Sequence, residues 1–369
     1  MNIFYDHTIF EQVYGGVSRY FCEIIRRLAG YEGIDINLFM GLFLNRYSLN
    51  DIKKSCRAFW GYPVPSLPHT ISLRRAINRE SWKIFTQIYD DGKQESIYHP
   101  TYYNYAGLHA SKVVFTVYDF THERYSSLFP SDDDTSALKA KAFDRADTLI
   151  CISESTKKDL LELYNIKPSS KVKVIYLGFN DLAKQPEDLN ILPDRPYFLY
   201  VGTRRGYKNF GCLINAFASE HALQNDFVIV CCGGSPFSDE EKDFFAGLNI
   251  QNKIFYRSGS DSILSSLYKN AVAFVYPSLY EGFGIPLLEA MNCGCPVIAS
   301  NTSSIPEVVG SAALLFDPNS PEELGDLLTD MVSQDTLRKK MITLGQERSQ
   351  MFSWEKCAKE TLAFYKEII

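Results

Sequence analysis

Short apolar runs alternate with amphipathic stretches along most of the chain. The runs Asn2–Asp6, Lys112–Tyr118 and Tyr197–Val201 are bounded by turn residues, which is typical of buried strands. Between such runs, apolar residues recur at the three- and four-residue spacing of a helix, as they do from Ser18 to Leu28. This alternation predicts an α/β fold with parallel sheets.

The same patterns predict most of the remaining elements. Further strands are expected at residues 34–39, 97–99, 148–152, 171–176, 227–232, 253–256, 271–276, 297–300 and 312–316, and further helices at 321–331, 336–348 and 354–368. The pattern is weakest over residues 42–95, where only a loop at 62–68 and a helix at 71–89 stand out.

The predicted helix 71–89 is amphipathic. Its polar side would carry Arg74, Arg75, Arg79 and Lys83, and its apolar side Ile77, Trp82, Ile84, Phe85 and Ile88. A basic helix with aromatic residues packs against a protein core or lies at a membrane surface, so peripheral membrane contact through residues 71–89 is an open alternative.

The chain of 369 residues exceeds one ordinary core, and two domains are expected. A polar segment with two prolines, residues 178–196, is the predicted linker. We therefore expect one domain over residues 1–178 and a second over 179–353.

Composition narrows the class of protein. The net charge of −6 gives no support for a nucleic-acid partner. The sequence has neither an apolar run of transmembrane length nor a signal peptide at its start, and its nine cysteines form no framework. These features favour a cytoplasmic protein with reduced thiols.

One segment predicts a ligand site. A strand at 271–276 is followed by Glu281 and a glycine loop, then by a helix from Pro286 that contains Glu289, and then by a strand at 297–300. This is a parallel βαβ unit, and such units bind ligands at the carboxyl ends of their strands. The helix start at Phe283–Ile285 would attract an anion, while the two carboxylates would accept hydrogen bonds from sugar hydroxyls. Alternatively, both glutamates are simply solvated.

The segment from Glu281 to Glu289, Glu-Gly-Phe-Gly-Ile-Pro-Leu-Leu-Glu, resembles the Glu-x7-Glu signature of the retaining glycosyltransferases of family 4, which have the GT-B fold. The resemblance implies two doubly wound Rossmann-like domains that face each other across a cleft. The first would bind the acceptor, and the C-terminal helix 354–369 would pack back on it. The second would bind the nucleotide sugar, with Glu281 on the donor sugar and Glu289 on the ribose.

The resemblance adds further candidates for binding the nucleotide sugar. Gly15 and Gly16, which alone are a weak signal, match the family's glycine loop near the donor phosphates. Arg204 and Lys208 follow a strand together with Arg205, and the family places an Arg and a Lys of this loop on the diphosphate. The loop itself would contribute Gly282, Phe283, Gly284 and Ile285. Solvated surface is the alternative for the cations.

Two segments of the first half, His99–Tyr103 and Tyr118–Glu123, follow strands and are expected to line the cleft. Both are similar to a mannosyltransferase-like branch of the family, but Tyr118 stands where many relatives have His. The catalytic role of that His would fall to Asp119 or His122, or it is dispensable. His122 is alternatively an inert loop residue.

No metal ion is expected. The run Ser131–Asp134 precedes an amphipathic helix and is interpreted as a helix cap rather than a metal site. Cys293 and Cys295 lack a second pair of ligands, and the family works without a metal.

The predicted activity is therefore transfer of a sugar, with retention, from a nucleoside diphosphate sugar to a hydroxyl of a glycan or lipid-linked oligosaccharide in surface polysaccharide synthesis. The branch resemblance favours GDP-mannose as donor. Such an enzyme would be cytoplasmic or peripheral at the inner face of the membrane. The alternatives are another GT-B enzyme, such as a sugar-nucleotide epimerase or a phosphorylase, and a non-catalytic sugar-binding protein.

Overall fold

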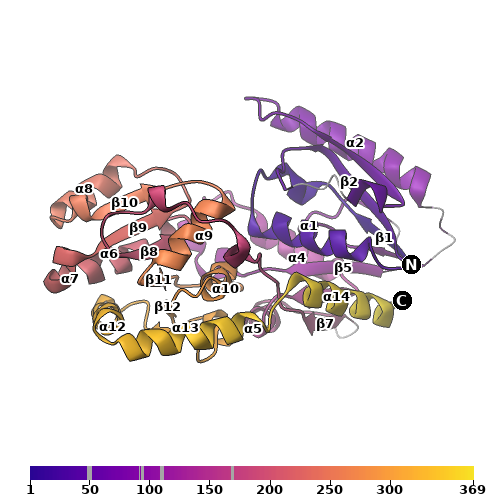
Figure 1. Cartoon of the computed structure of the whole chain (residues 1–369). Coiled ribbons are helices and arrows are strands. Elements are labelled where there is room, and N and C mark those ends of the chain that lie inside the picture. The colour runs from indigo at the N-terminus through magenta and orange to yellow at the C-terminus, as the bar shows by residue number, and fades with distance from the viewer. Residues whose placement is uncertain (48–51, 91, 93–94, 109–111, 168–169) are drawn as a thin grey trace. The chain divides into compact units, whose positions relative to one another are not determined.

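The computed structural model of the chain describes all residues except 48–51, 91, 93–94, 109–111 and 168–169 (Figure 1). The chain folds into two compact units. The first contains residues 1–123, 129–178 and 353–369, and the second contains residues 124–128 and 179–352. Each unit is an α/β layer structure around one parallel sheet, so the predicted fold class is confirmed.

In the first unit, the described residues form a parallel sheet of seven strands in the order β3-β2-β1-β4-β5-β6-β7. The strands are β1 Asn2–Tyr5, β2 Asp35–Phe43, β3 Ala58–Pro63, β4 Ser96–Tyr98, β5 Lys112–Val117, β6 Thr148–Cys151 and β7 Lys171–Val174. The helices are α1 Gly16–Leu28, α2 Ile71–Tyr89, α3 Thr121–Arg124, α4 Thr135–Arg145, α5 Glu154–Leu163 and α14 Trp354–Ile368.

In the second unit, the described residues form a parallel sheet of six strands in the order β10-β9-β8-β11-β12-β13. The strands are β8 Tyr197–Val201, β9 Val228–Cys232, β10 Ile254–Arg257, β11 Ala273–Tyr276, β12 Val297–Ser300 and β13 Leu314–Phe316. The helices are α6 Phe210–Ser219, α7 His221–Asp226, α8 Asp239–Gly247, α9 Asp261–Asn270, α10 Ile285–Asn292, α11 Ile305–Val309, α12 Pro321–Ser333 and α13 Asp335–Ser349.

The C-terminal helix α14 belongs to the first unit, where it packs against α1 (Figure 1). Gly178 lies where the chain leaves this unit, and a Cβ there would collide with the backbone of Trp354. Tyr365 of α14 hydrogen-bonds with both His99 and Tyr5 inside the unit. These contacts hold the last helix in the first unit.

Helix α2 has the predicted bounds, but the prediction of its buried face is only partly right. Its buried residues are Arg74, Asn78, Trp82, Phe85 and Thr86, whereas Ile77, Ile84 and Ile88 are exposed. Asn78 is buried because its side chain bonds the backbone of Leu42: it accepts from the N–H at 2.7 Å and donates to the carbonyl at 3.3 Å. The edge strand β3 was not predicted at all.

Candidate active site

Lys208 and Glu281 meet at the carboxyl ends of β8 and β11. Lys208 Nζ lies 2.7 Å from Glu281 Oε1, and both side chains are largely buried. The ring of Tyr276 also borders the ammonium group, 5.8 Å away, and burial together with the Glu281 carboxylate raises the pKa of the Tyr276 phenol well above 10. Two predicted site residues from distant parts of the chain therefore form one ion pair.

The loop that carries Glu281 is held by the segment after β12. Ser303 accepts a hydrogen bond from the N–H of Glu281 at 2.9 Å, and Ser304 donates to the carbonyl of Glu281 at 2.8 Å. Ser303 has a φ of 51°, an unusual conformation for a residue with a side chain. The sequence analysis did not assign either serine to the site, because nothing in its local pattern marks a residue that orients another loop.

Lys208 is positioned by its neighbour Asn209. This residue adopts the left-handed conformation that asparagine tolerates, with a φ of 53°, at the start of α6. Its amide donates to the carbonyls of Pro277 at 3.0 Å and Pro318 at 2.8 Å. Asn209 thereby ties the Lys208 loop to the ends of β11 and β13. Sequence analysis also missed this residue.

The glycine loop and helix α10 have the predicted form. Gly284 has a φ of 101°, which glycine adopts without strain, and a Cβ there would lie 2.7 Å from Leu287 Cδ1. Pro286 lies in the first turn of α10, and no side chain caps the helix start. The start of α10 thus suits an anion, the property predicted for Gly282, Phe283, Gly284 and Ile285.

Glu289 lies inside α10 and is only 4% exposed. It borders Tyr268 of α9, whose phenol is buried; burial, followed by the Glu289 carboxylate, raises the pKa of Tyr268 well above 10. Glu281 and Glu289 therefore flank the start of α10 from its loop and from within the helix.

Arg204 is used differently from Lys208. Its side chain is 4% exposed and pairs with Glu241, Nε to Oε1 at 2.7 Å and Nη2 to Oε2 at 3.2 Å. It also donates to the carbonyls of Gly233, Ser235 and Pro236. The guanidinium thus fixes the loop between β9 and α8, while its neighbour Arg205 is exposed.

A pocket of about 480 Å³ opens beside these arginines, at the carboxyl ends of β8 and β9. It is lined by Thr203, Arg204, Arg205, Gly234, Ser235, Pro236, Ser238 and Glu241. Open α/β sheets bind ligands at this edge.

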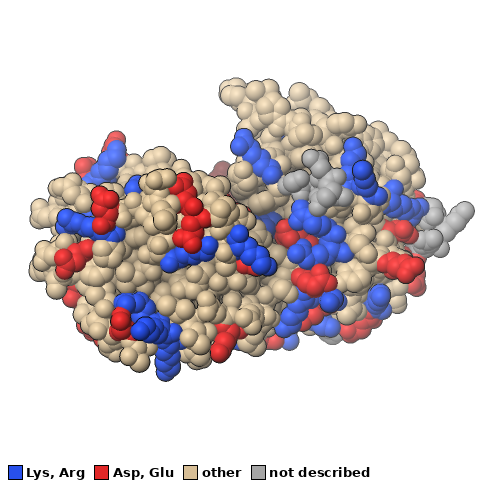
Figure 2. Space-filling view, in the orientation of Figure 1, with Lys and Arg blue, Asp and Glu red and all other residues tan. Residues whose placement is uncertain are grey.

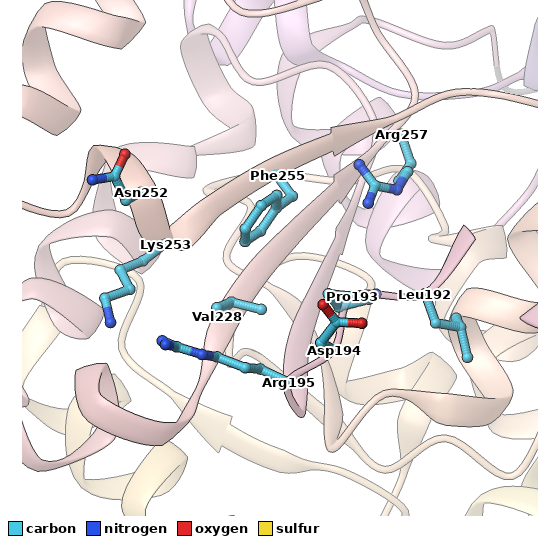
Figure 3. Close-up of a pocket in the computed structure, with 9 residues that line it drawn as sticks. All are labelled: Leu192, Pro193, Asp194, Arg195, Val228, Asn252, Lys253, Phe255 and Arg257. Atoms are coloured by element: carbon cyan, nitrogen blue, oxygen red, sulfur yellow. The ribbon is translucent and has the colours of Figure 1, made fainter. Parts of the chain in front are cut away.

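A second pocket, of about 520 Å³, lies along the edge strand β10 (Figure 3). Among its lining residues are Arg195, Val228 and Lys253, at the opposite ends of the strands from Glu281. Arg257 turns its side chain to this pocket and donates to the carbonyl of Ile191 at 2.8 Å. We therefore place the candidate site at the carboxyl edge and not in the pocket of Figure 3.

In the first unit, Gly16 begins α1 and Gly15 precedes it in an extended conformation. Ser18 donates to the carbonyl of Gly15 at 3.0 Å, and a Cβ at Gly16 would meet no atom within 4 Å. A ligand could therefore approach the start of α1 closely.

Asp119 follows β5 and is partly exposed. Its Oδ1 accepts from the N–H of Thr121 at 3.0 Å and lies 3.9 Å from Nζ of the buried Lys139. Lys139 also pairs with Glu123 at 2.9 Å. The carboxylate of Asp119 thus has a fixed orientation and a nearby positive charge.

His122 lies on the short helix α3, where its ring stacks on Phe129 with centroids 4.0 Å apart. Its Nε2 is 3.8 Å from Asp133 Oδ2. Asp133 also accepts from the N–H of Thr135 at 3.0 Å, whereas Asp134, the N-cap residue of α4, makes no side-chain cap bond. The acidic run therefore precedes a helix, as predicted, and Asp133 is the aspartate whose side chain bonds the first turn of α4.

Tyr118 and His99 do not line an open site. Tyr118 packs between the rings of Tyr20 and Tyr103, and burial raises its pKa well above 10. His99 is fully buried, and burial lowers its pKa to about 3. Both side chains face the core of the first unit, and the expectation that the segments His99–Tyr103 and Tyr118–Glu123 line a cleft stays a prediction.

Within the described residues, no three His, Cys, Asp or Glu side chains gather into a group that could hold a metal ion. In that same part of the chain, no helix combines the length and apolar character needed to cross a membrane.

Two protein-family models match the chain. The model described as Glycosyltransferase Family 4 matches residues 14–181, and the model described as Glycosyl transferases group 1 matches residues 181–348. Together they cover residues 14–348, which leaves the C-terminal helix α14 of the first unit outside the match.

Similar proteins and structures agree with these matches. O-antigen chain mannosyltransferase B of Escherichia coli is 28% identical over 373 residues, which cover 95% of this chain and 96% of that protein. O-antigen chain mannosyltransferase RfbU of Salmonella typhimurium is 31% identical over 55% of this chain and 56% of that protein. The solved structure of sucrose-phosphate synthase from Thermosynechococcus elongatus has a TM-score of 0.78 at 22% identity and covers 100% of this chain and 99% of that chain. At that identity the structural likeness concerns the fold alone.

Proposed function

Because the chain belongs to glycosyltransferase family 4 and has the GT-B fold, we propose that it transfers mannose from GDP-mannose to a hydroxyl of a growing surface glycan or lipid-linked oligosaccharide, with retention at the anomeric carbon. The match to the O-antigen mannosyltransferase covers 95% of this chain and 96% of that protein. This likeness supports both mannose as the sugar and a surface glycan as the acceptor class.

The observation that carries the proposal is the Lys208–Glu281 pair beside the start of α10. Breaking the bond between sugar and phosphate builds negative charge on the departing diphosphate and positive charge on the sugar. A lysine and a helix start stabilise the first, because their positive ends are fixed before the reaction. A carboxylate at the same place orients the sugar hydroxyls and favours the second.

Within this proposal each residue has a distinct task. Lys208 and the loop from Gly282 to Ile285 meet the diphosphate, Glu281 the donor sugar and Glu289 the ribose. Arg204 fixes the adjacent loop through Glu241, which leaves the exposed Arg205 as the guanidinium that meets an anion in the 480 Å³ pocket. Gly15 and Gly16 of the first unit admit the donor phosphates.

Asp119 and His122 are proposed to act on the acceptor side of the reaction. Asp119 is the stronger candidate, because it is more exposed and its orientation is fixed by Thr121. Its task would be to orient the acceptor hydroxyl or to stabilise positive charge on the sugar. We further propose that no metal ion is needed, since Lys208 and the start of α10 supply positive charge for the diphosphate.

Nucleotide-dependent thermal stabilisation tests the proposal. A ligand that binds only the folded chain stabilises it by RT ln(1 + [L]/Kd), about 2.7 kcal/mol at a concentration a hundredfold above Kd. We expect GDP and GDP-mannose to raise the melting temperature of the chain more than UDP, ADP, dTDP and their sugars do.

Stabilisation by a uridine nucleotide alone would contradict GDP-mannose but keep the transferase. The absence of stabilisation by every nucleotide would contradict the proposed donor site. A Lys208→Met variant that lost the response to GDP would assign the response to this site.

A further inference from the structure

The pocket along the edge strand β10 has no task in the proposed transfer reaction. Its volume of about 520 Å³ is that of a small-molecule site, since such sites measure roughly 300–1,000 Å³. All of its lining residues belong to the second unit: they lie just before β8, at the start of β9 and along β10 (Figure 3). The pocket is therefore a candidate for a second ligand.

One face of β10 borders this pocket. Successive residues of a strand point to opposite faces, and Ile254 packs into the core of the second unit. Phe255 and Lys253, its neighbours in sequence, both line the pocket instead, and so does Arg257 at the end of the strand. An aromatic ring thus lies between two cations along the strand (Figure 3).

A third cation, Arg195, lies level with Lys253 at the amino ends of the strands. The N–H of Val228, the first residue of β9, donates to the carbonyl of Pro196, and Lys253 directly precedes β10. Because β9 lies between β8 and β10, the backbones of Arg195 and Lys253 are separated by two strand spacings, about 10 Å. Two side chains of this length can converge on one anionic group above Val228.

Within the described residues, these cations have no acidic partner. Residues 179–352 carry 13 Lys and Arg against 21 Asp and Glu, and Figure 2 shows side chains of both signs interspersed over this unit. The pocket instead has three cations and one acid, Asp194, and none of the four forms an ion pair with a described residue. The Arg195 guanidinium donates only to the carbonyl of Asn225, at 3.5 Å. A hollow lined mainly by one sign of charge attracts the opposite sign.

Arg257 closes the other end of the pocket in a fixed orientation. Its Nε donates to the carbonyl of Ile191 at 2.8 Å and its Nη1 to the carbonyl of Tyr256 at 3.0 Å. The guanidinium carbon lies 5.9 Å from the centroid of the Phe255 ring. A wall that is ordered before the ligand arrives lowers the entropic cost of binding.

We propose that this pocket binds a sugar phosphate. A phosphate monoester carries about 1.5 to 2 negative charges at pH 7, which matches the pair Arg195 and Lys253, and arginine binds phosphate oxygens in bidentate fashion. The sugar ring lies over Phe255, and its hydroxyls donate to the carboxylate of Asp194 and accept from the amide of Asn252. The inference concerns a second ligand and does not depend on the transfer reaction.

Calorimetric titration of the full chain with mannose 6-phosphate and glucose 6-phosphate tests the proposal. We expect at least one of them to bind tenfold or more tightly than inorganic phosphate, because the ring adds contacts, and we expect no binding of mannose. Lys253→Gln and Arg195→Gln should each weaken the binding of that sugar phosphate about tenfold or more, because each removes a charge-assisted hydrogen bond. Asp194→Ala should weaken the sugar phosphate but not inorganic phosphate, because only the sugar donates to this carboxylate.

The matched control is Lys339→Gln, which removes an exposed cation of the same unit from α13 and should leave binding unchanged. Lys208→Met should also retain the binding; its loss there would place the ligand in the proposed donor site and overturn the proposal. Absence of binding by both sugar phosphates, affinities equal to that of inorganic phosphate, or equal losses in the control and the pocket variants would likewise overturn it. None of these outcomes bears on transfer from GDP-mannose. If one pocket variant did not fold, the other would decide.

Discussion

Lys208 and Arg204 both lie in the loop that follows β8, but their charges have different partners. Arg204 is enclosed by Glu241 and three carbonyls. Burial alone would raise the pKa of Glu241, but the paired Arg204 guanidinium lowers it. Lys208 pairs with Glu281 of the candidate site, and its side chain is 20% exposed, against 4% for Arg204. A diphosphate can therefore reach Lys208 more readily than Arg204.

Substitutions of the two glutamates Glu281 and Glu289 should affect different quantities, kcat in one case and nucleotide affinity in the other. Glu281→Ala is expected chiefly to lower kcat, because its carboxylate orients the sugar that reacts. Glu289→Ala is expected chiefly to weaken nucleotide binding. Each change removes a charge-assisted hydrogen bond, at about 1.5–3 kcal/mol or roughly 10- to 150-fold. Steady-state kinetics and calorimetric Kd values for the nucleotide measure the two effects.

The control for this pair is Glu240→Ala, an exposed glutamate in the first turn of α8. It should leave both quantities unchanged. If Glu281→Ala and Glu289→Ala behaved like Glu240→Ala, the assignment of both site residues would be wrong.

Asp119→Asn should lower kcat by about 10²–10⁴-fold if the carboxylate acts in general acid–base fashion. The amide oxygen can still accept from the N–H of Thr121, so the loop should keep its conformation. Affinity for the nucleotide should remain, and His122→Ala should have a mild effect because its ring stacks on Phe129.

The exposed Asp132→Asn serves as the control for the loss of an aspartate in this region. Assays of kcat and nucleotide Kd distinguish the outcomes. A large loss in His122→Ala with a mild effect of Asp119→Asn would move the function to the histidine. Near-normal rates in both variants would leave neither side chain with a chemical role.

At the level of single elements, periodicity predicted where helix α2 lies but only part of its buried face. A helix with apolar residues on two sides and cations between them gives no single answer from spacing. In the structure, the buried side of α2 is the one that carries Asn78, whose side-chain amide bonds the backbone of Leu42 in β2. Gly41 makes room for this contact, since a Cβ there would collide with Asn78 Oδ1. Such a polar contact between elements far apart in sequence leaves no local signal.

The contact of α14 with the first unit should depend on pH. Tyr365 of α14 bonds His99, and burial lowers the pKa of His99 to about 3, against 6.5 in an unfolded chain. Between these values the unfolded chain binds one more proton. The contribution of neutral His99 to the free energy of unfolding is therefore fully present above pH 6.5. It falls by up to about 1.4 kcal/mol per pH unit as the pH decreases toward 3.

Thermal unfolding at pH 7 and pH 5 of the wild type and His99→Gln tests this linkage. The variant should be less stable at pH 7 but should lose less melting temperature between the two pH values. An equal loss in both proteins would contradict a neutral, buried His99.

For the whole molecule, the order of strands and helices could be predicted because both sheets are parallel, and each strand is a short apolar run followed by a helix. The sequence also indicated Lys208 and Glu281 as residues at strand ends and Glu289 as a residue of the helix that follows Glu281. The partners that orient them, Ser303, Ser304 and Asn209, could not be predicted, since their contacts join separate loops at one sheet edge. Nor could the pairing of Arg204 with Glu241 across 37 residues of sequence.

The most direct test of the central claim is the anomeric configuration of a transferred sugar. The chain is incubated in EDTA with GDP-mannose labelled with carbon-13 and with octyl α-mannoside as the acceptor, and the product is analysed by NMR. We expect an α-linked dimannoside, little transfer from UDP-glucose or UDP-N-acetylglucosamine, and a large loss of product in Glu281→Ala. A β-linked product, or transfer of glucose or N-acetylglucosamine but not mannose to the same acceptor, would contradict the claim.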